Sequence, residues 1–188
     1  MDIKKKLREM LLTEGAHSHK NKFGCLMVFL DFNKKDWDKI QDNIDKDDLY
    51  EPEGESGYGL EKDPHTTILY GFHGDIPYED LEKEIVKIKK VDVKLTKVSA
   101  FKNEKFDVIK FDVISDDLHK LNKKFSEFPH TTNFPDYHPH ATIAYCKPNT
   151  SDKLVKKINE YLKDNEFLVS PNKLVYSKVD GSKKEYSL

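Results

Sequence analysis

A seven-residue phrase occurs twice in this chain, and it constrains the fold more than any other feature of the sequence. It reads PHTTILY over residues 64–70 and PHATIAY over residues 139–145. Both copies begin with proline and continue with β-branched and aromatic residues, which is typical of short strands. The sequence therefore predicts two strands of similar construction, one in each half of the chain.

Each phrase places a histidine two residues before a threonine. Residues i and i+2 of a strand point to the same face, so His65 should lie beside Thr67, and His140 beside Thr142. A lone His-x-Thr carries little information, and one histidine on a strand is more often structural than catalytic. Two copies in matched contexts favour a site built from two imidazoles and two hydroxyls.

The repeat extends beyond the phrase itself. A shift of 75 residues carries His65 onto His140, the helix expected over 77–88 onto one at 152–163, and the strand starting near 91 onto one near 166. Strand–helix–strand–strand is thus expected twice, which implies two lobes related by a pseudo-twofold axis. Under such an axis the two His-x-Thr strands would meet at the centre. Apolar periodicity predicts the remaining elements: helices over 3–13, 34–44 and 116–128, and strands over 23–30, 106–114, 166–179 and 183–188, the last two joined by a turn at Asp180-Gly181.

The 188-residue chain is expected to form one domain of two lobes, interrupted by a polar loop over residues 45–63. That loop holds eight acidic residues and two lysines, together with Tyr50 and Tyr58. Long loops are often functional, so either tyrosine could cover a bound base; a mobile insertion is the alternative. Trp37 could also stack on a base, but its spacing with Ile40 and Ile44 favours core packing.

Charge limits the kind of partner. The formal net charge is −2, lysines alternate with acids, and Arg8 is the only arginine. Bidentate binding of phosphate by arginine is therefore nearly unavailable. The sequence also shows no basic stripe of the kind that binds a long nucleic acid. A small phosphate-bearing substrate fits better. Neither a membrane span nor a signal peptide is expected, and Cys25 and Cys146 are expected to be buried free thiols in a reducing cytoplasm.

Two imidazoles suit acid–base chemistry at phosphorus. Imidazole exists in both protonation states near neutrality, so one histidine could take a proton from water or a ribose 2′-hydroxyl while the other protonates the leaving oxygen. Threonine hydroxyls could bind the phosphoryl oxygens. Neither a metal nor another cofactor is required, and which histidine is the acid stays open.

Other interpretations of the polar residues remain. His65, His138 and His140 could be zinc ligands, although this leaves the repeat unexplained. His17 and His19 could form a metal pair or belong to a solvated linker. Asp63 and Asp136 could orient an imidazole or lie in solvent.

The two motifs resemble those of the 2H phosphoesterase superfamily, which is named for paired His-x-Thr/Ser motifs. The resemblance implies an α+β bilobal fold with two antiparallel sheets, flanking helices and an active site in the central cleft. It also implies metal-independent chemistry on cyclic phosphates or phosphodiesters, with His65 and His140 as general acid and base and with Thr67 and Thr142 binding phosphate.

Three short segments are similar to phage anti-CBASS nucleases, which degrade the cyclic di- and trinucleotides that bacteria make as an infection alarm. These segments are FGCLM at 23–27, DPHTTILYG at 63–71 and YHPHATIAY at 137–145. The resemblance implies hydrolysis of 3′–5′ bonds in such rings in the host cytoplasm. Phe23 and Tyr137 would be base contacts, with packing as the alternative, and Tyr186 stands in a C-terminal segment that lacks a tryptophan. The rivals are a 2′,3′-cyclic phosphodiesterase or ligase acting on RNA ends, and a protein that sequesters cyclic nucleotides without cleaving them.

Overall fold

The computed structural model describes residues 23–132, 134, 136–163 and 165–188. The helix expected over 3–13 and the pair His17 and His19 lie outside the described residues. The strands of the described chain are β1 (Gly24–Leu30), β2 (His65–Phe72), β3 (Val93–Lys102), β4 (Asp107–Ile114), β5 (His140–Cys146), β6 (Phe167–Val169), β7 (Pro171–Ser177) and β8 (Lys183–Ser187). Its α-helices are α2 (Lys34–Gln41), α3 (Tyr78–Ile85), α4 (Asp116–Phe125) and α5 (Ser151–Leu162), and Lys46–Asp48 form a 3₁₀ turn.

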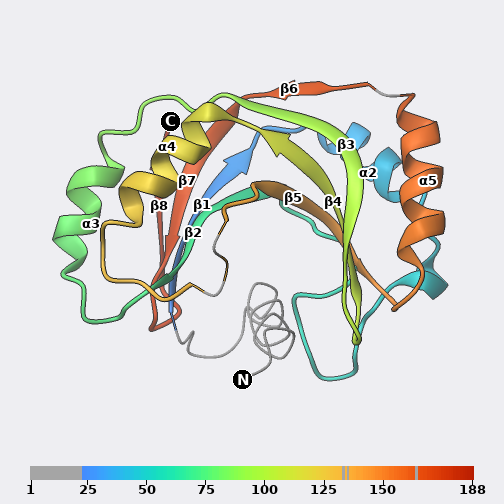
Figure 1. The fold of residues 1–188 in the computed structure, drawn as a ribbon, viewed down its shortest axis with the longest axis horizontal. Coiled ribbons are helices and arrows are strands. Elements are labelled where there is room, and N and C mark those ends of the chain that lie inside the picture. Colours follow the sequence, from blue (N-terminus) through green and yellow to red (C-terminus); the bar gives the residue numbers. More distant parts are fainter. Residues whose placement is uncertain (1–22, 133, 135, 164) are drawn as a thin grey trace.

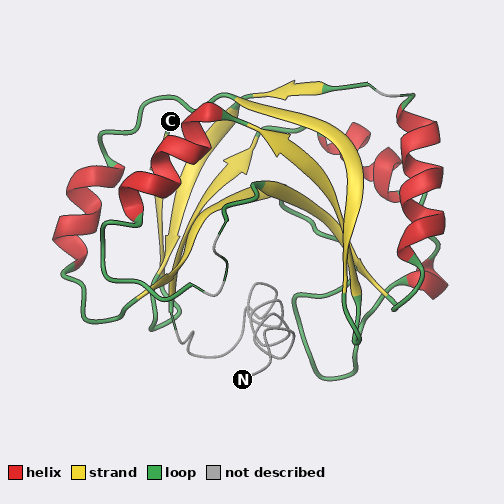
Figure 2. Ribbon diagram, viewed as in Figure 1, coloured by secondary structure: helices red, strands yellow, loops and turns green. Residues whose placement is uncertain are grey.

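The strands form two antiparallel sheets of four, in the orders β2-β1-β7-β8 and β5-β4-β3-β6. The two sheets together make an arch, with β2 and β5 at its centre and the helices along its outer flanks (Figures 1 and 2). This α+β arrangement confirms the fold class that the sequence predicted.

The helices pack on the outer faces of the sheets because one side of each is apolar. α4 contacts β2, whereas α5 contacts β3, β4 and α2. Asn33 and Ser115 cap the N-termini of α2 and α4, because their side-chain oxygens accept hydrogen bonds from backbone N–H groups of the first turn. The first three helices end a few residues earlier than expected, although Ile44 and Ile88 still pack into the core from the turns that follow.

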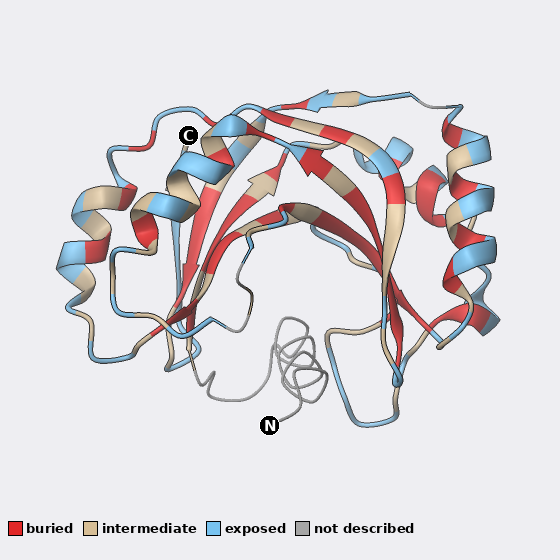
Figure 3. Cartoon of the chain, in the orientation of Figure 1, coloured by how far each residue is buried: buried red, intermediate tan, exposed pale blue. Residues whose placement is uncertain are grey.

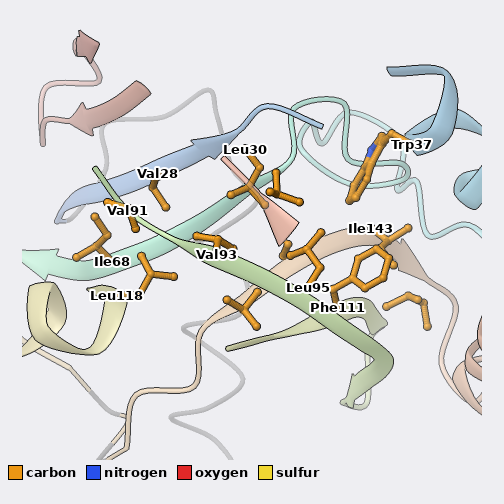
Figure 4. Packing of buried hydrophobic residues seen from close by; sticks show 14 of the residues in the cluster. Val28, Leu30, Trp37, Ile68, Val91, Val93, Leu95, Phe111, Leu118 and Ile143 are labelled. Atoms are coloured by element: carbon orange, nitrogen blue, oxygen red, sulfur yellow. The ribbon is translucent and has the colours of Figure 1, made fainter. Parts of the chain in front are cut away.

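One hydrophobic cluster includes residues of both sheets and of all four described α-helices. Buried residues are concentrated along the strands and on the inward sides of the helices (Figure 3). Ile68 of β2 and Ile143 of β5 are fully buried in this cluster, and so is Trp37, whose indole NH donates to the Glu61 carbonyl at 2.9 Å. Figure 4 shows these three side chains among their neighbours. The expectation that Trp37 packs in the core is therefore confirmed.

The pseudo-twofold relation holds, but its repeating unit differs from the one expected. Exchanging the sheets exchanges β2 with β5, β1 with β4 and β7 with β3, as their orders show. β4 thus corresponds to β1, and not to β8 as the 75-residue shift implied. The actual unit is strand–helix–strand–helix–strand, and in each half the last strand crosses to the sheet of the other half.

The strand expected over residues 166–179 is in fact two strands. β6 pairs with β3 in one sheet, and β7 pairs with β1 in the other. The chain crosses between them at Ser170, whose carbonyl accepts from the Asp31 amide at 3.1 Å. Pro171 has no N–H to donate and cannot continue the β6 ladder. The turn at Asp180-Gly181 joins β7 to β8 as predicted, with Gly181 at a φ of 86°.

Two smaller expectations concern membrane-spanning helices and the two cysteines. Within the described chain, no helix combines the length and the apolar character that crossing a bilayer requires. Neither cysteine is in a disulfide. Cys146 is buried as expected, whereas Cys25, on β1, is only partly buried.

Candidate active site

The two His-x-Thr strands are neighbours. β2 is an edge of one sheet, β5 is an edge of the other, and the two strands contact each other at the centre of the arch (Figure 1). The expectation that these strands meet on the pseudo-twofold axis is confirmed. Each strand follows its proline directly, and each buries an isoleucine on the side opposite its histidine and threonine.

A bulge in each strand brings a third side chain to the same face. Thr67 pairs with Met27 and Leu69 with Leu26, so that the β2 register slips after the threonine. The same slip occurs in β5, where Thr142 pairs with Lys110 and Ala144 with Ile109. In a regular strand a residue three positions on points the other way. The bulges therefore place Tyr70 and Tyr145, the last residues of the two phrases, on the face of the histidines.

Both imidazoles are held in the same way. Nδ1 of His65 lies 2.8 Å from the Asp63 carbonyl oxygen, and Nδ1 of His140 lies 2.9 Å from the His138 carbonyl oxygen. A carbonyl oxygen only accepts, so each Nδ1 carries the hydrogen. Nε2 of the neutral ring is then the proton acceptor, and Nε2–H of the charged ring is the donor. The two rings are thus set up identically for proton transfer through Nε2.

Aromatic rings contact both histidines, but in different geometries. Phe29 stacks on His65 with the ring centres 5.3 Å apart at 23°. Phe101 and His140 form a T-shaped pair, with the ring centres 5.0 Å apart at 90°. A lysine lies over each phenylalanine, at 5.1 Å for Lys173 and 4.3 Å for Lys110.

A charged network lies beneath the second motif. Lys110 and Asp112 are the β4 partners of Thr142 and His140. Lys110 Nζ lies 2.5 Å from an Asp112 carboxylate oxygen and donates to Ser99 at 2.8 Å. Burial acts to raise the pKa of Asp112, but the hydrogen bonds from Lys110 and Ser99 outweigh it, and that pKa is lowered. The first lobe has Met27 and Phe29 at the corresponding positions.

Two cavities open on this face, and each joins the two lobes. The smaller, about 370 Å³, is lined by His65 of one motif and Tyr145 of the other. The larger, about 750 Å³, is lined by Thr67 and Tyr70 of the first motif and by His140 of the second. Each histidine thus shares a cavity with the tyrosine of the opposite strand. Thr142 is buried and lines neither of these two cavities.

A loop from the opposite half borders each cavity. The acidic loop over 45–63 follows the free edge of β5, where Tyr50 N–H donates to the Tyr145 carbonyl at 3.0 Å and Tyr145 N–H donates to the Gly59 carbonyl at 2.8 Å. Rather than a detached insertion, it is an irregular extension of the β5 sheet. Tyr58 lines the smaller cavity, and Tyr50 and Tyr58 pack together with Tyr145 and Phe106.

The segment over residues 126–132 covers β2 in the corresponding way. Thr131 N–H donates to the Gly71 carbonyl at 2.9 Å, and His73 N–H donates to the Pro129 carbonyl at 3.2 Å. Gly71 has a φ of 115°, and a Cβ there would come within 2.1 Å of the Thr131 carbonyl oxygen. Only glycine fits at this crossing.

Of the two suggested base contacts, only Tyr137 is among the residues that line the larger cavity. Its hydroxyl donates to the Thr67 carbonyl at 2.7 Å. Burial raises the pKa of this phenol. Phe23 packs against Tyr70, with the ring centres 6.1 Å apart. Tyr137 therefore ties the second lobe to the first, whether or not its ring also meets a ligand.

The carboxylates proposed to orient the histidines do not do so. The backbone carbonyl of Asp63 holds His65, and a different residue, His138, holds His140. The exposed side chains of Asp63 and Asp136 line the smaller and the larger cavity. Among the described residues, no three histidine, cysteine or acidic side chains are grouped as a metal site requires, so His65, His138 and His140 do not form one.

Sequence reasoning missed three features of this site: the cleft-facing tyrosines, the Lys110–Asp112–Ser99 network and His130. The first had a visible signal, because both phrases keep the tyrosine. Lys110 and Asp112 fall on the polar positions of a regular apolar–polar alternation in their strand, so the pattern does not mark them as unusual. His130 also had a visible signal, because Pro129-His130-Thr131-Thr132 repeats the first four residues of the phrase at 64–70.

Comparisons with known proteins agree with this arrangement. A family model described as the 2′-5′ RNA ligase superfamily matches residues 33–181, a range that includes both motifs. A solved structure of Usb1 from Kluyveromyces marxianus, with uridine monophosphate, has a similar fold, with a TM-score of 0.56 and 13% sequence identity. The similarity covers 90% of this chain and 99% of that one. A search of curated proteins found no match.

Proposed function

Because the chain belongs to the 2′-5′ RNA ligase superfamily of 2H phosphoesterases, we propose that it is a phosphodiesterase that uses His65 and His140 as general base and general acid. The observation that carries the proposal is the identical support of the two imidazoles, each through Nδ1 and a carbonyl two residues earlier. Two residues with the same geometry on either side of a phosphate can exchange the acid and base roles.

In this reaction one Nε2 takes a proton from the attacking oxygen, which is water or a neighbouring ribose 2′-hydroxyl. The new P–O bond forms as the old one breaks, and the other Nε2–H protonates the departing oxygen. Thr67 and Thr142 hydrogen-bond the phosphoryl oxygens as negative charge develops there. No step requires a metal ion.

The substrate that we propose is a cyclic di- or trinucleotide whose 3′–5′ bond is cut. Such an activity would remove a bacterial alarm signal and so counter CBASS defence in the host cytoplasm. Support comes from the phrases around the motifs and from the near-neutral charge with one arginine. Cavities on both sides of the His–Thr pairs suit a ligand that continues in both directions from its phosphate.

Processing of RNA ends is the second candidate. It is favoured by the name of the family model and by the similarity of the fold to Usb1, a structure that contains uridine monophosphate. In this case a 2′,3′-cyclic phosphate or the terminal phosphodiester of an oligoribonucleotide would occupy the same His–Thr pairs. The same catalytic residues would serve either substrate.

One experiment separates these functions. The protein, with EDTA present, is incubated with a panel of cyclic dinucleotides and trinucleotides and with oligoribonucleotides ending in a 3′-hydroxyl or a 2′,3′-cyclic phosphate. Products are followed by chromatography, with His65→Ala and His140→Ala in parallel. Turnover of rings by the wild type alone supports the first proposal, and turnover of RNA ends alone supports the second. Ligand recovered unchanged in stoichiometric amount would identify a sequestering protein.

A further inference from the structure

We infer that the larger cavity is a subsite for a nucleobase that bears an exocyclic amino group. The inference rests on the proposed function only in that the ligand is a nucleotide, and it adds which bases the site accepts. The cavity begins at Thr67 and His140, where the phosphate would lie, and extends to a wall formed by Ser126 and His130. Its volume of about 750 Å³ lies within the range of small-molecule sites.

The cavity has the aromatic lining that a base requires. Tyr70, Phe101, Phe134 and Tyr137 contribute rings to it. Stacking on such rings stabilises any base and does not distinguish one from another. Discrimination must therefore come from the polar groups of the wall.

The two polar side chains of that wall, Ser126 and His130, present hydrogen-bond acceptors to the cavity. The Ser126 hydroxyl donates its single hydrogen to the Asn122 carbonyl at 2.7 Å. His130 lies with Nδ1 2.8 Å from the Phe128 carbonyl oxygen, which leaves Nε2 of the neutral ring as an acceptor. The Tyr137 hydroxyl is likewise used, on the Thr67 carbonyl. In each case a backbone carbonyl has taken the donor hydrogen.

Two further side chains strengthen this bias. Asn122 donates one of its two amide hydrogens to the Ile68 carbonyl at 2.8 Å, and its amide oxygen is a further acceptor. Asp136, also in the lining, accepts only when ionised. The one lysine of the lining, Lys102, is paired with Asp152 at 2.6 Å.

An acceptor-lined wall selects among bases by their edges. Cytosine presents an amino group where uracil presents a carbonyl, and guanine carries a 2-amino group that hypoxanthine lacks. A carbonyl facing Ser126 or His130 would leave two acceptors opposed, and a buried polar group without its partner weakens binding. Cytosine and guanine are therefore favoured over uracil and hypoxanthine.

Binding of mononucleotides tests this without any turnover. CMP is compared with UMP, and GMP with IMP, each as the 3′- and the 5′-monophosphate, by NMR titration of the wild-type chain to millimolar ligand. We expect the amino-bearing member of each pair to bind roughly threefold to tenfold tighter, the effect of one net hydrogen bond. Equal affinities within both pairs, or no binding at all, would overturn the inference.

Variants identify the residues responsible. Ser126→Ala and His130→Phe each remove one acceptor and should reduce the preference to less than about twofold. His73→Ala is the control, because His73 holds the same loop through the Thr131 hydroxyl at 2.9 Å but does not line the cavity. A preference that survives both variants, or that His73→Ala abolishes as well, would contradict the assignment. Ser126→Ala removes one oxygen and keeps the test informative if His130→Phe is poorly folded.

The subsite and the proposed reaction can fail separately. An amino-group preference without cleavage of any cyclic nucleotide would leave the subsite and refute that substrate. Cleavage of cyclic nucleotides with equal binding of CMP and UMP, and of GMP and IMP, would do the reverse.

Discussion

His65 and His140 are held in the same way, yet the two sides of the cleft around them differ in size, charge and ring geometry. The His65 side has a stacked phenylalanine and a cavity of about 370 Å³ bordered by lysines and acids. The His140 side has a phenylalanine at right angles to the imidazole, a half-buried ion pair and a cavity of about 750 Å³ lined by aromatic rings. The proton-transfer geometry is duplicated, and the surfaces that would meet the substrate are not.

A phosphodiester explains why such an arrangement is useful. The attacking oxygen must lose a proton on one side of the phosphorus, and the leaving oxygen must gain one on the other side. Both proton transfers suit an imidazole. The groups attached to those two oxygens differ, both in a cyclic nucleotide and at an RNA end. A duplicated centre with unequal flanks therefore fits the proposed chemistry, and substitutions on the two sides should reveal where the equivalence ends.

The largest effect should come from the histidines themselves. We expect His65→Ala and His140→Ala each to lower kcat by about 10²- to 10⁴-fold, because each removes one proton transfer. His73→Ala, outside both cavities, serves as the control. Steady-state rates on the preferred substrate of the panel measure the effect. Loss in only one of the two variants would mean that the matched geometry does not reflect matched roles.

The two loops that border the cavities should respond unequally when a glycine at each crossing is replaced by alanine. Gly71→Ala places a methyl against the rigid Thr131 carbonyl, so the loop beside the larger cavity must move. We expect a loss of about 2 kcal/mol or more in stability and at least a tenfold loss of activity. Thermal unfolding and steady-state rates are the measurements.

Gly59→Ala is the matched change in the other loop. Its Cβ meets only the Glu51 side chain, which can rotate away, although the φ of 79° remains unfavourable for alanine. About 1 kcal/mol of stability should be lost, with little change in rate. Equal effects of the two substitutions would show that the loops contribute alike.

The third test concerns the Lys110–Asp112 ion pair beneath His140. Lys110→Met gives β4 the residue that β1 has at the corresponding position, Met27. Asp112, about one-third exposed, then lacks its partner, and we expect a loss of roughly 1–2 kcal/mol together with a several-fold lower kcat. Adding Asp112→Asn should restore most of the stability, as a double-mutant cycle would show.

The stability difference should also depend on pH. Lys110 contributes to lowering the pKa of Asp112 below its ordinary value of 3.8. A depressed carboxyl pKa stabilises the fold above that ordinary value, and the stabilisation is lost as the pH falls through the folded-state value. Wild type and Lys110→Met should therefore differ at neutral pH and converge once the pH has fallen below the folded-state pKa of Asp112. A difference that persists in acid would point to packing instead.

Much of this fold followed from local pattern. The repeated phrase predicted β2, β5 and their meeting, since a period of two and a leading proline are local properties. The division of residues 166–179 between two sheets could not be predicted, because it depends on which edge each half of the segment meets. The same holds for the correspondence of β4 with β1, which is a relation between sheets and not between positions in the chain.

The site was predictable where its residues repeat and not where they differ. His65, Thr67, His140 and Thr142 were evident from matched spacing, and their chemical roles stay predictions. The bulges that turn Tyr70 and Tyr145 toward the cleft arise from pairing with β1 and β4, which no single segment encodes. Nδ1 of His130 lies beside the Phe128 carbonyl oxygen, in a loop whose course is set by Gly71. The position of His130 at the larger cavity therefore depended on the tertiary fold.

The smallest effect should come from the rings beside the histidines. Phe29 stacks on His65, whereas the rings of Phe101 and His140 lie at right angles. Phe29→Leu keeps an apolar side chain and removes the stacked ring that helps to orient the imidazole. We expect kcat to fall by about threefold, measured as a steady-state rate on the preferred substrate.

Phe101→Leu is the matched change on the other side. The Phe101 ring lies at 90° to that of His140 and has Lys110 over it, so this replacement removes a different contact of the imidazole. Equal losses of rate in the two variants would show that the two imidazoles are equivalent despite the different ring geometries. A loss in only one variant would place the asymmetry of the cleft at the histidines themselves.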